Sequence, residues 1–77
     1  MEVLVYTKPD CHYCNSAKLL LTIKQIEYKE VEIGKDIIRE DFVSIFPNVR
    51  TAPLIIIDGV KIGGYNELKR HLDDQSV

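Results

Sequence analysis

Short apolar runs recur along the chain, and each is bounded by polar or turn-forming residues. Residues 3–6 are β-branched, apolar or aromatic, and a run of this length and composition is typical of a buried strand. Residues 26–33 alternate between apolar and charged side chains, with one slip at positions 29 and 30. Alternation with a period of two still predicts a second strand there.

The most hydrophobic run, Leu54–Ile57, predicts the central strand of a sheet. It is followed by Asp58-Gly59, a dipeptide that favours two-residue hairpin turns because both residues tolerate positive φ. Residues 60–62 therefore predict a short edge strand that returns beside the central one.

Three stretches have the apolar spacing of amphipathic helices. The first covers residues 11–25, takes most of its apolar face from residues 19–21, and has Asp10 as a candidate N-cap. The second covers residues 36–46. The third covers residues 65–72 and is followed by a polar tail.

In chain order these elements read β-α-β-α-β-β-α, which predicts an α/β fold. The first strand, the first helix and the second strand form a right-handed crossover with parallel pairing, whereas the hairpin pairs antiparallel. The expected fold is a mixed sheet of four strands with helices on both faces. A chain of 77 residues forms one small core, so we expect residues 1–77 to be a single domain.

Composition and charge narrow the classes of function. The chain is 45% hydrophobic and 29% charged, as expected of a globular protein. Its formal net charge of -2 gives no excess of positive charge for binding nucleic acid or an anionic membrane. No apolar run approaches the ~20 residues of a membrane span, and the first four residues lack the regions of a signal peptide. We expect a soluble, cytoplasmic monomer.

The two cysteines lie three positions apart, where the first strand pattern gives way to the first helix. A thiol at a helix start lies beside unpaired N–H groups and the positive end of the helix dipole, which favour its reactive thiolate. Residues i and i+3 share a helix face, so a disulfide between Cys11 and Cys14 is plausible. So short a loop stabilises the fold little. In a cytosolic protein the pair indicates a reversible dithiol centre.

Three motifs extend this pattern. They are Tyr6-Thr7-Lys8-Pro9-Asp10-Cys11-His12-Tyr13-Cys14, Thr51-Ala52-Pro53 before the third strand, and Gly63-Gly64-Tyr65-Asn66-Glu67-Leu68 at the last helix. In this order and at these separations, the chain resembles the glutaredoxin branch of the thioredoxin fold over essentially its whole length. The resemblance implies thiol-disulfide exchange with glutathione as co-substrate and with no permanently bound cofactor.

The resemblance also implies separate roles for the two cysteines. Cys11 would be the exposed nucleophile that forms a mixed disulfide with glutathione or a protein, and the more buried Cys14 would resolve it. Pro53 would follow a cis peptide bond beside the cysteines. It would thereby present the backbone of Ala52 to a bound thiol peptide, much as a sheet edge receives an added strand.

Further residues are candidates for binding glutathione, and each has a plainer alternative. Lys8 and Arg50 offer charges to the bound peptide unless they are simply solvated, and Tyr13 either lines the docking surface or only packs there. Backbone N–H groups at the start of the last helix would hold a γ-glutamyl carboxylate or form an ordinary glycine-rich turn. The candidates are Lys8, Tyr13, Arg50, Thr51, Ala52, Pro53, Gly64, Tyr65 and Asn66.

Two departures from the family pattern concern the partner. His12 replaces the proline of the usual Cys-Pro-Tyr-Cys motif and adds a group that can be charged near neutral pH. Asn66 stands where the family often carries an acid that meets the amino end of glutathione. The shortness of the chain and Tyr65-Asn66 are also similar to what is found in small redoxins that reduce ribonucleotide reductase and are recharged by thioredoxin reductase.

Three functions follow from these observations. The main hypothesis is a glutaredoxin that reduces protein disulfides and glutathione mixed disulfides. The alternatives are a redoxin-type electron donor and a redox-inert binding module with the same fold. We expect no metal: zinc needs four ligands, and the cysteines and His12 do not provide them. A minor alternative is an iron–sulfur cluster that is shared between two chains and held by Cys11 and glutathione.

Overall fold

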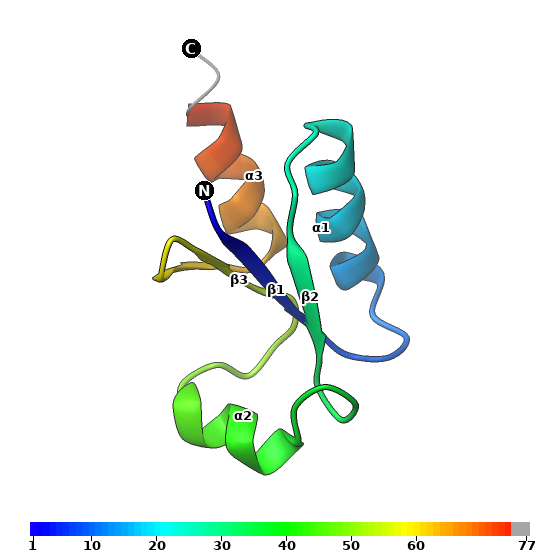
Figure 1. Cartoon of the computed structure of the whole chain (residues 1–77), viewed down its shortest axis with the longest axis vertical. Helices are drawn as coiled ribbons and strands as arrows, with labels where there is room; N and C mark the ends of the chain where they lie inside the picture. The colour runs from blue at the N-terminus through cyan, green and yellow to red at the C-terminus, as the bar shows by residue number, and fades with distance from the viewer. Residues whose placement is uncertain (75–77) are drawn as a thin grey trace.

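The computed structural model describes residues 1–74, which contain the predicted elements in the predicted order (Figure 1). The last helix runs past the predicted end at residue 72, and the rest of the predicted polar tail lies outside the described residues. The elements are β1 (Val3–Thr7), α1 (His12–Ile23), β2 (Lys29–Glu32), α2 (Arg39–Ile45), β3 (Leu54–Ile57), β4 (Val60–Gly63) and α3 (Tyr65–Asp74).

The strands form one mixed sheet in the order β2-β1-β3-β4. β1 pairs in parallel with β2 and antiparallel with β3, and β3 pairs antiparallel with β4. These pairings confirm the parallel pairing predicted for the first two strands and the antiparallel pairing predicted for the hairpin. At the hairpin turn, Asp58 and Gly59 have φ values of 50° and 81°, and positive φ at both positions is what this two-residue turn requires.

Hydrophobic side chains pack on both faces of the sheet. α1 and α3 lie together against one face, and α2 lies at the other end of the molecule (Figure 1). All of β3 is buried. Ile55 and Ile57 belong to the cluster under α1 and α3, whereas Leu54 and Ile56 belong to the cluster that contains Phe42 of α2. The sheet therefore has helices on both faces, as predicted.

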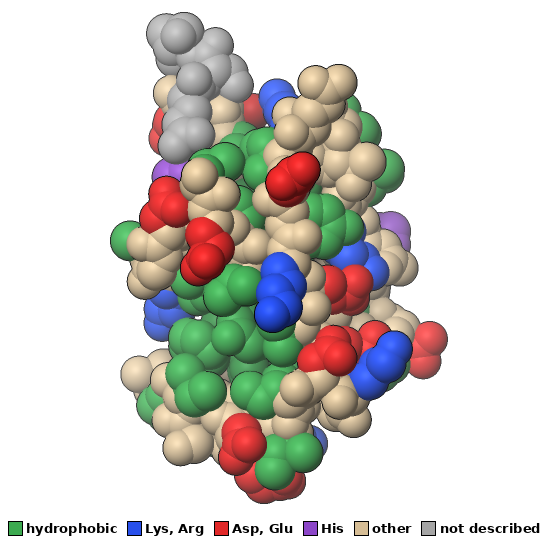
Figure 2. Space-filling view, in the orientation of Figure 1, with side chains coloured by type: hydrophobic (Ala, Val, Ile, Leu, Met, Phe, Trp, Pro, Cys, Tyr) green, Lys and Arg blue, Asp and Glu red, His purple; other side chains and the backbone are tan. Residues whose placement is uncertain are grey.

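Aromatic contacts hold the short helix α2 against the sheet. The ring of Tyr6 in β1 lies 5.4 Å from that of Phe42 and 5.3 Å from that of Phe46, centroid to centroid. A helix of this length is not stable alone, and no side chain caps its start at Ile38. On the face shown in Figure 2, hydrophobic side chains form a continuous area just above α2. Packing, and not intrinsic propensity, thus positions α2.

The predicted strand over residues 26–33 is too long at its start, and the end of α1 explains why. The helix ends in a Schellman motif, with Gln25 at a φ of 59°. The N–H of Gln25 donates to the carbonyl of Thr22 at 3.0 Å, and the N–H of Ile26 donates to the carbonyl of Leu21 at 2.9 Å. Ile26 therefore closes the helix and packs on the core before the strand begins.

The slip in the alternation also has a structural reason. Ile26 and Tyr28 pack against the cluster under α1 and α3, whereas Ile33 packs against the cluster of α2. The apolar positions change from one face of the sheet to the other between them. A single alternating pattern cannot describe a segment that contributes to both faces.

The second helix begins at Arg39, later than the predicted residue 36, because a tight turn takes up the preceding residues. The carboxylate of Asp36 accepts a hydrogen bond from the N–H of Glu32 at 2.9 Å. Gly34, at a φ of 95°, donates its N–H to the carbonyl of Ile37 at 2.7 Å. Asp36 therefore stabilises this turn and does not start the helix.

The packing of α1 against the sheet leads to a stability prediction. Leu21→Ala is expected to lower the free energy of unfolding by about 2–5 kcal/mol, because Leu21 is 0% exposed in the core. Leu19→Ala in the same helix, where the side chain is 59% exposed, is expected to change it by less than about 0.5 kcal/mol. Denaturant unfolding of the oxidised protein measures both values, and equal losses would contradict this packing.

Candidate redox site

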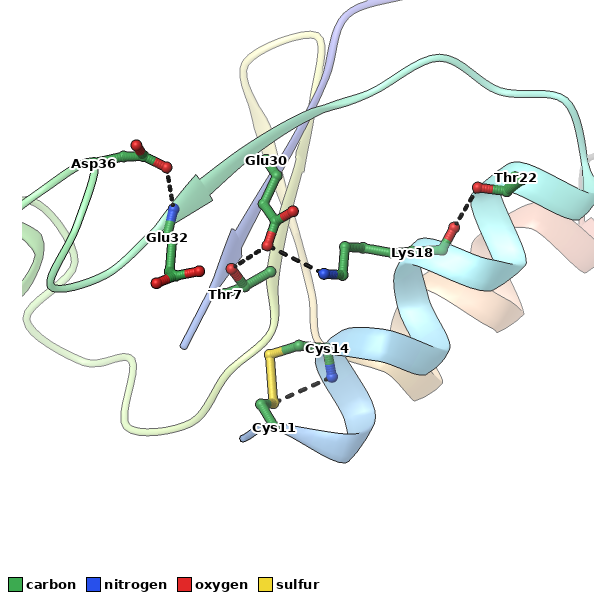
Figure 3. Close-up of polar contacts among 8 residues, drawn as sticks. All are labelled: Thr7, Cys11, Cys14, Lys18, Thr22, Glu30, Glu32 and Asp36. Carbon is green, nitrogen blue, oxygen red and sulfur yellow. Dashed lines mark hydrogen bonds and ion pairs between the residues drawn. A yellow bond between two sulfur atoms is a disulfide. The ribbon is translucent and has the colours of Figure 1, made fainter. Parts of the chain in front are cut away.

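Cys11 and Cys14 form a disulfide at the start of α1, with their Cα atoms 5.2 Å apart (Figure 3). Cys11 is the N-cap residue, and its Sγ accepts a hydrogen bond from the N–H of Cys14 at 3.1 Å. The prediction that Asp10 caps this helix is wrong, because Asp10 lies one residue too early and has a φ of 55°. A sulfur thus takes the place of the usual capping oxygen. In the reduced protein the same N–H favours the thiolate of Cys11.

The two cysteine residues differ in exposure in the predicted order. Cys14 is 1% exposed and Cys11 is 7% exposed. The expectation of an openly exposed Cys11 is nevertheless wrong for the disulfide form, because its Sγ lies 3.7 Å from the carbonyl oxygen of Ala52. The peptide bond between Ala52 and Pro53 is cis, as the resemblance implied. The turn before β3 therefore covers one side of the reactive sulfur.

A hollow of about 220 Å³ lies beside this turn, and most of the predicted binding residues line it. Tyr13 is 58% exposed, and its ring centroid lies 6.2 Å from that of Tyr65 at the start of α3. The structure thus brings together three segments that are far apart in the sequence. The lining residues are Tyr13, Thr51, Ala52, Pro53, Gly64, Tyr65, Asn66 and Glu67.

The other two predicted binding residues, Lys8 and Arg50, line a second and larger hollow of about 560 Å³ next to α2. The two hollows share Thr51 and Ala52. The sequence analysis missed the larger hollow because its other residues come from the position after β2, from α2 and from the segment that follows α2. No local motif connects these segments.

Glu67 lines the smaller hollow, although the sequence analysis gave it no role. Its Oε1 accepts a hydrogen bond from the N–H of Gly64 at 2.8 Å, as in a capping box. The three-residue spacing between them was the signal available in the sequence. Gly63 has a φ of 126°, and a Cβ there would lie 2.8 Å from Cγ of Glu67. Glycine at this position therefore lets a carboxylate fold back over the start of α3.

A polar cluster lies near Cys14 and joins β1, α1 and β2 (Figure 3). Oε2 of Glu30 accepts hydrogen bonds from the hydroxyl of Thr7 at 2.8 Å and from the ammonium of Lys18 at 3.2 Å. Thr7 is only 1% exposed. The hydrogen bond from Thr7 lowers the pKa of Glu30 most, burial opposes this, and Lys18 lowers the pKa further. The sequence analysis did not identify this cluster, which connects β1, α1 and β2 through side chains.

His12, which departs from the family motif, is exposed and lies against Tyr13 with ring centroids 5.7 Å apart. It does not join the cysteines in a metal site. Within residues 1–74, no three histidine, cysteine, aspartate or glutamate side chains lie close enough together to hold an ion. Over the same residues, no helix has the length and apolarity needed to cross a membrane.

A disulfide at the start of the first helix, a cis-proline turn beside it and this sheet order define a thiol-disulfide oxidoreductase of the thioredoxin fold. Comparison with known proteins identifies the branch. The Glutaredoxin family model matches residues 3–62. The chain therefore belongs to the glutaredoxin family, as the sequence motifs indicated.

Individual relatives agree with this assignment. Glutaredoxin 3 of Escherichia coli (strain K12) is 35% identical over 67 residues, which is 87% of this chain and 81% of the relative. The crystal structure of glutaredoxin 1 from Francisella tularensis, complexed with cacodylate, has a TM-score of 0.83 and 31% identity, covering 96% of this chain and 94% of that one. A buckwheat glutaredoxin-glutathione complex has a TM-score of 0.77 and 27% identity, covering 95% and 70%.

The position of Glu30 generates a prediction about pH. The pKa of Glu30 is lowered in the folded state. Its carboxylate therefore stabilises the fold at pH values above the ordinary pKa of glutamate, and this stabilisation is lost as the pH falls. At pH 7, Glu30→Gln is expected to reduce the free energy of unfolding by less than about 1 kcal/mol, since the pair is partly exposed. The difference from wild type should narrow as the pH falls below 4.5.

Unfolding in denaturant at a series of pH values measures this difference. Glu27→Gln, which changes an exposed glutamate just before β2, serves as the control. A loss for Glu30→Gln that stays constant from neutral to acidic pH would argue against a stabilising carboxylate.

Proposed function

We propose that this protein is a dithiol glutaredoxin that reduces protein disulfides and glutathione mixed disulfides in the cytoplasm. The observation that carries the proposal is the position of the Cys11 sulfur. It caps α1, is bonded to Cys14 and lies beside the carbonyl of Ala52. A redox-inert module would not need a sulfur that accepts a backbone N–H bond at a helix start.

The reaction proceeds by two exchanges. The Cys11 thiolate attacks one sulfur of a substrate disulfide, the other substrate sulfur leaves as a thiolate that takes a proton from solvent, and a mixed disulfide forms. The Cys14 thiol loses its proton and attacks Cys11, which releases the second substrate thiol and leaves the Cys11–Cys14 disulfide. Two glutathione molecules then restore the dithiol: the first forms a mixed disulfide with Cys11, and the second removes it as glutathione disulfide.

We place the γ-glutamyl end of glutathione in the smaller hollow. The hollow contains Tyr65, Asn66 and the carboxylate of Glu67. Backbone N–H groups at the start of α3 suit the glutamyl carboxylate. Asn66 has no carboxylate to bind the amino group of glutathione, and Glu67 provides one instead. Lys8 and Arg50, in the larger hollow, remain available for the glycyl carboxylate. A buckwheat relative was solved in complex with glutathione, which supports glutathione as the ligand.

One observation favours a second candidate, a redoxin-type electron donor to ribonucleotide reductase that thioredoxin reductase recharges. The N–H of Gly64 already donates to Glu67 at 2.8 Å. A glutathione carboxylate that used this N–H would have to displace a charged side chain. A protein reductase that reaches Cys11 directly does not meet this competition.

Substitution of each cysteine tests the exchange itself. Cys11→Ser is expected to abolish reduction of a glutathionylated peptide, because serine supplies no thiolate. Cys14→Ser is expected to retain the first step and to accumulate a mixed disulfide at Cys11, detected by mass spectrometry. Circular dichroism shows whether both variants are folded. Turnover by a folded Cys11→Ser protein would overturn the proposal.

The source of electrons is tested with the oxidised protein and NADPH. Glutathione with glutathione reductase is expected to support turnover. Turnover with thioredoxin reductase alone would favour the redoxin instead.

The role of Glu67 is tested by substitution. Glu67→Gln is expected to raise the KM for a glutathione mixed disulfide about twofold to fivefold, because one exposed ion pair is lost. Gln keeps a capping oxygen for Gly64, and Asp73→Asn at the far end of α3 is the matched control.

A further inference from the structure

The two faces of the sheet are covered unequally. α1 and α3, of 12 and 10 residues, lie against one face, whereas α2, of seven residues, lies at one end of the other (Figure 1). A sheet face left to solvent is normally polar. Here Leu4 and Tyr6 of β1 are only partly buried, although they pack on the cluster that contains Phe42. In Figure 2 a continuous hydrophobic area extends upward from α2. This face therefore has apolar surface available to another molecule.

One flank of α2 extends this apolar surface. Ile38 at the N-cap is 56% exposed, and Ile45 at the last helical residue is 57% exposed. Residues seven positions apart lie on one side of a helix, so the two isoleucines share a flank. Neither of them lines either hollow beside Cys11, whereas Arg39 and Val43 line the larger one. The exposed isoleucines are thus separate from the redox site.

A row of residues across all four strands ends in a lysine at each edge of the sheet. In spatial order the row is Lys29, Leu4, Ile56 and Lys61. Neighbours in such a row point to the same face, so the exposed lysines border the apolar surface on the side away from α2. Glu2 and Asp58 lie farther still from α2, and the carboxylate of Asp58 accepts a hydrogen bond from the N–H of Glu2 at 2.7 Å.

The opposite border of the apolar surface is acidic. Asp41 is exposed in the first turn of α2, three residues from Ile38 and four from Ile45, and this spacing places it on the same flank as both. Within residues 1–74, neither Asp41 nor the two lysines of the row take part in an ion pair. The face thus has cations at one end, an apolar centre and an anion at the other end.

We propose that two copies of this chain associate through this face, around a two-fold axis perpendicular to the sheet near Tyr6. An isologous contact needs a surface that is complementary to itself. The rotation brings Asp41 of each copy to Lys29 and Lys61 of the other and joins the apolar centres. A partner of a single charge would match only one end of the face. The dimer replaces the monomer expected from the sequence, goes beyond the proposed function and leaves both hollows open.

The size of the face indicates a weak dimer. A standard interface buries ~800 Å² of each partner, which is about a seventh of the 5432 Å² surface of this chain. The proposed contact is confined to one part of a sheet face and one flank of a seven-residue helix. We therefore expect association in the micromolar to millimolar range of concentration.

Sedimentation of the oxidised protein over this range tests the association, because the Cys11–Cys14 disulfide leaves no thiol for cross-linking. The average mass is expected to rise from one chain toward two. Ile45→Asp is expected to weaken the dimer at least about tenfold. The matched control is Ile23→Asp at the last residue of α1, which is 67% exposed and is expected to have no effect. A wild-type protein that stays monomeric, or an equal loss in the control, would overturn the inference.

Charge reversal tests the two-fold arrangement. Lys29→Glu/Lys61→Glu and Asp41→Lys are each expected to be monomeric where the wild type dimerises, because like charges then meet. An equimolar mixture of the two proteins is expected to form a heterodimer, a gain that unfolding could not produce. Lys69→Glu/Arg70→Glu on the exposed part of α3 makes the same charge change elsewhere and is expected to dimerise normally. A monomeric mixture, or a monomeric α3 variant, would contradict this arrangement.

Exchange activity separates this inference from the proposed function. Ile45→Asp is expected to keep the wild-type kcat/KM for a glutathionylated peptide, because Ile45 lines neither hollow. Loss of exchange in a folded, monomeric Ile45→Asp protein would show that the contact reaches the redox site, against the inference. A wild-type dimer without exchange activity would overturn the proposed function and leave the dimer standing.

Discussion

The hydrogen bond from the N–H of Cys14 to the sulfur of Cys11 connects the fold to its chemistry. It exists because β1 ends at Thr7 and the chain turns through Asp10, at positive φ, so that Cys11 arrives as the extended N-cap of α1. A first helical residue at any other position would leave the sulfur without this donor. The reactivity of the site thus depends on where one helix begins.

The periodic features of the fold were predictable from the sequence. The buried run Leu54–Ile57, the Asp58-Gly59 turn and the helical spacing after Cys11 each act over a few residues, and the structure confirms the element order and the thioredoxin-like sheet. The element ends were less predictable. Asp10 has the chemistry of a cap but not the required backbone conformation. The closing role of Ile26 was hidden because Gln25, and not the usual glycine, takes the positive-φ position at the end of α1.

Tertiary contacts account for what the sequence analysis missed in the site. Glu30 looks like one charged position in an alternating strand, and its importance arises only when Thr7 and Lys18 converge on it. Arg39 and Val43 looked like ordinary positions of an amphipathic helix. They line the larger hollow because α2 lies next to the turn that covers Cys11. The cysteines themselves were identifiable because their spacing and their place at a helix start are local features of the sequence, and two further motifs accompany them.

The two hollows meet at a single wall, formed by Thr51 and Ala52, beside a single reactive sulfur. One sulfur atom can form only one mixed disulfide at a time, whichever hollow the substrate or glutathione occupies. An electron acceptor and an electron donor therefore take turns, and catalysis follows a ping-pong order without a ternary complex at Cys11. The alternation is a property of this shared wall and requires no conformational gate.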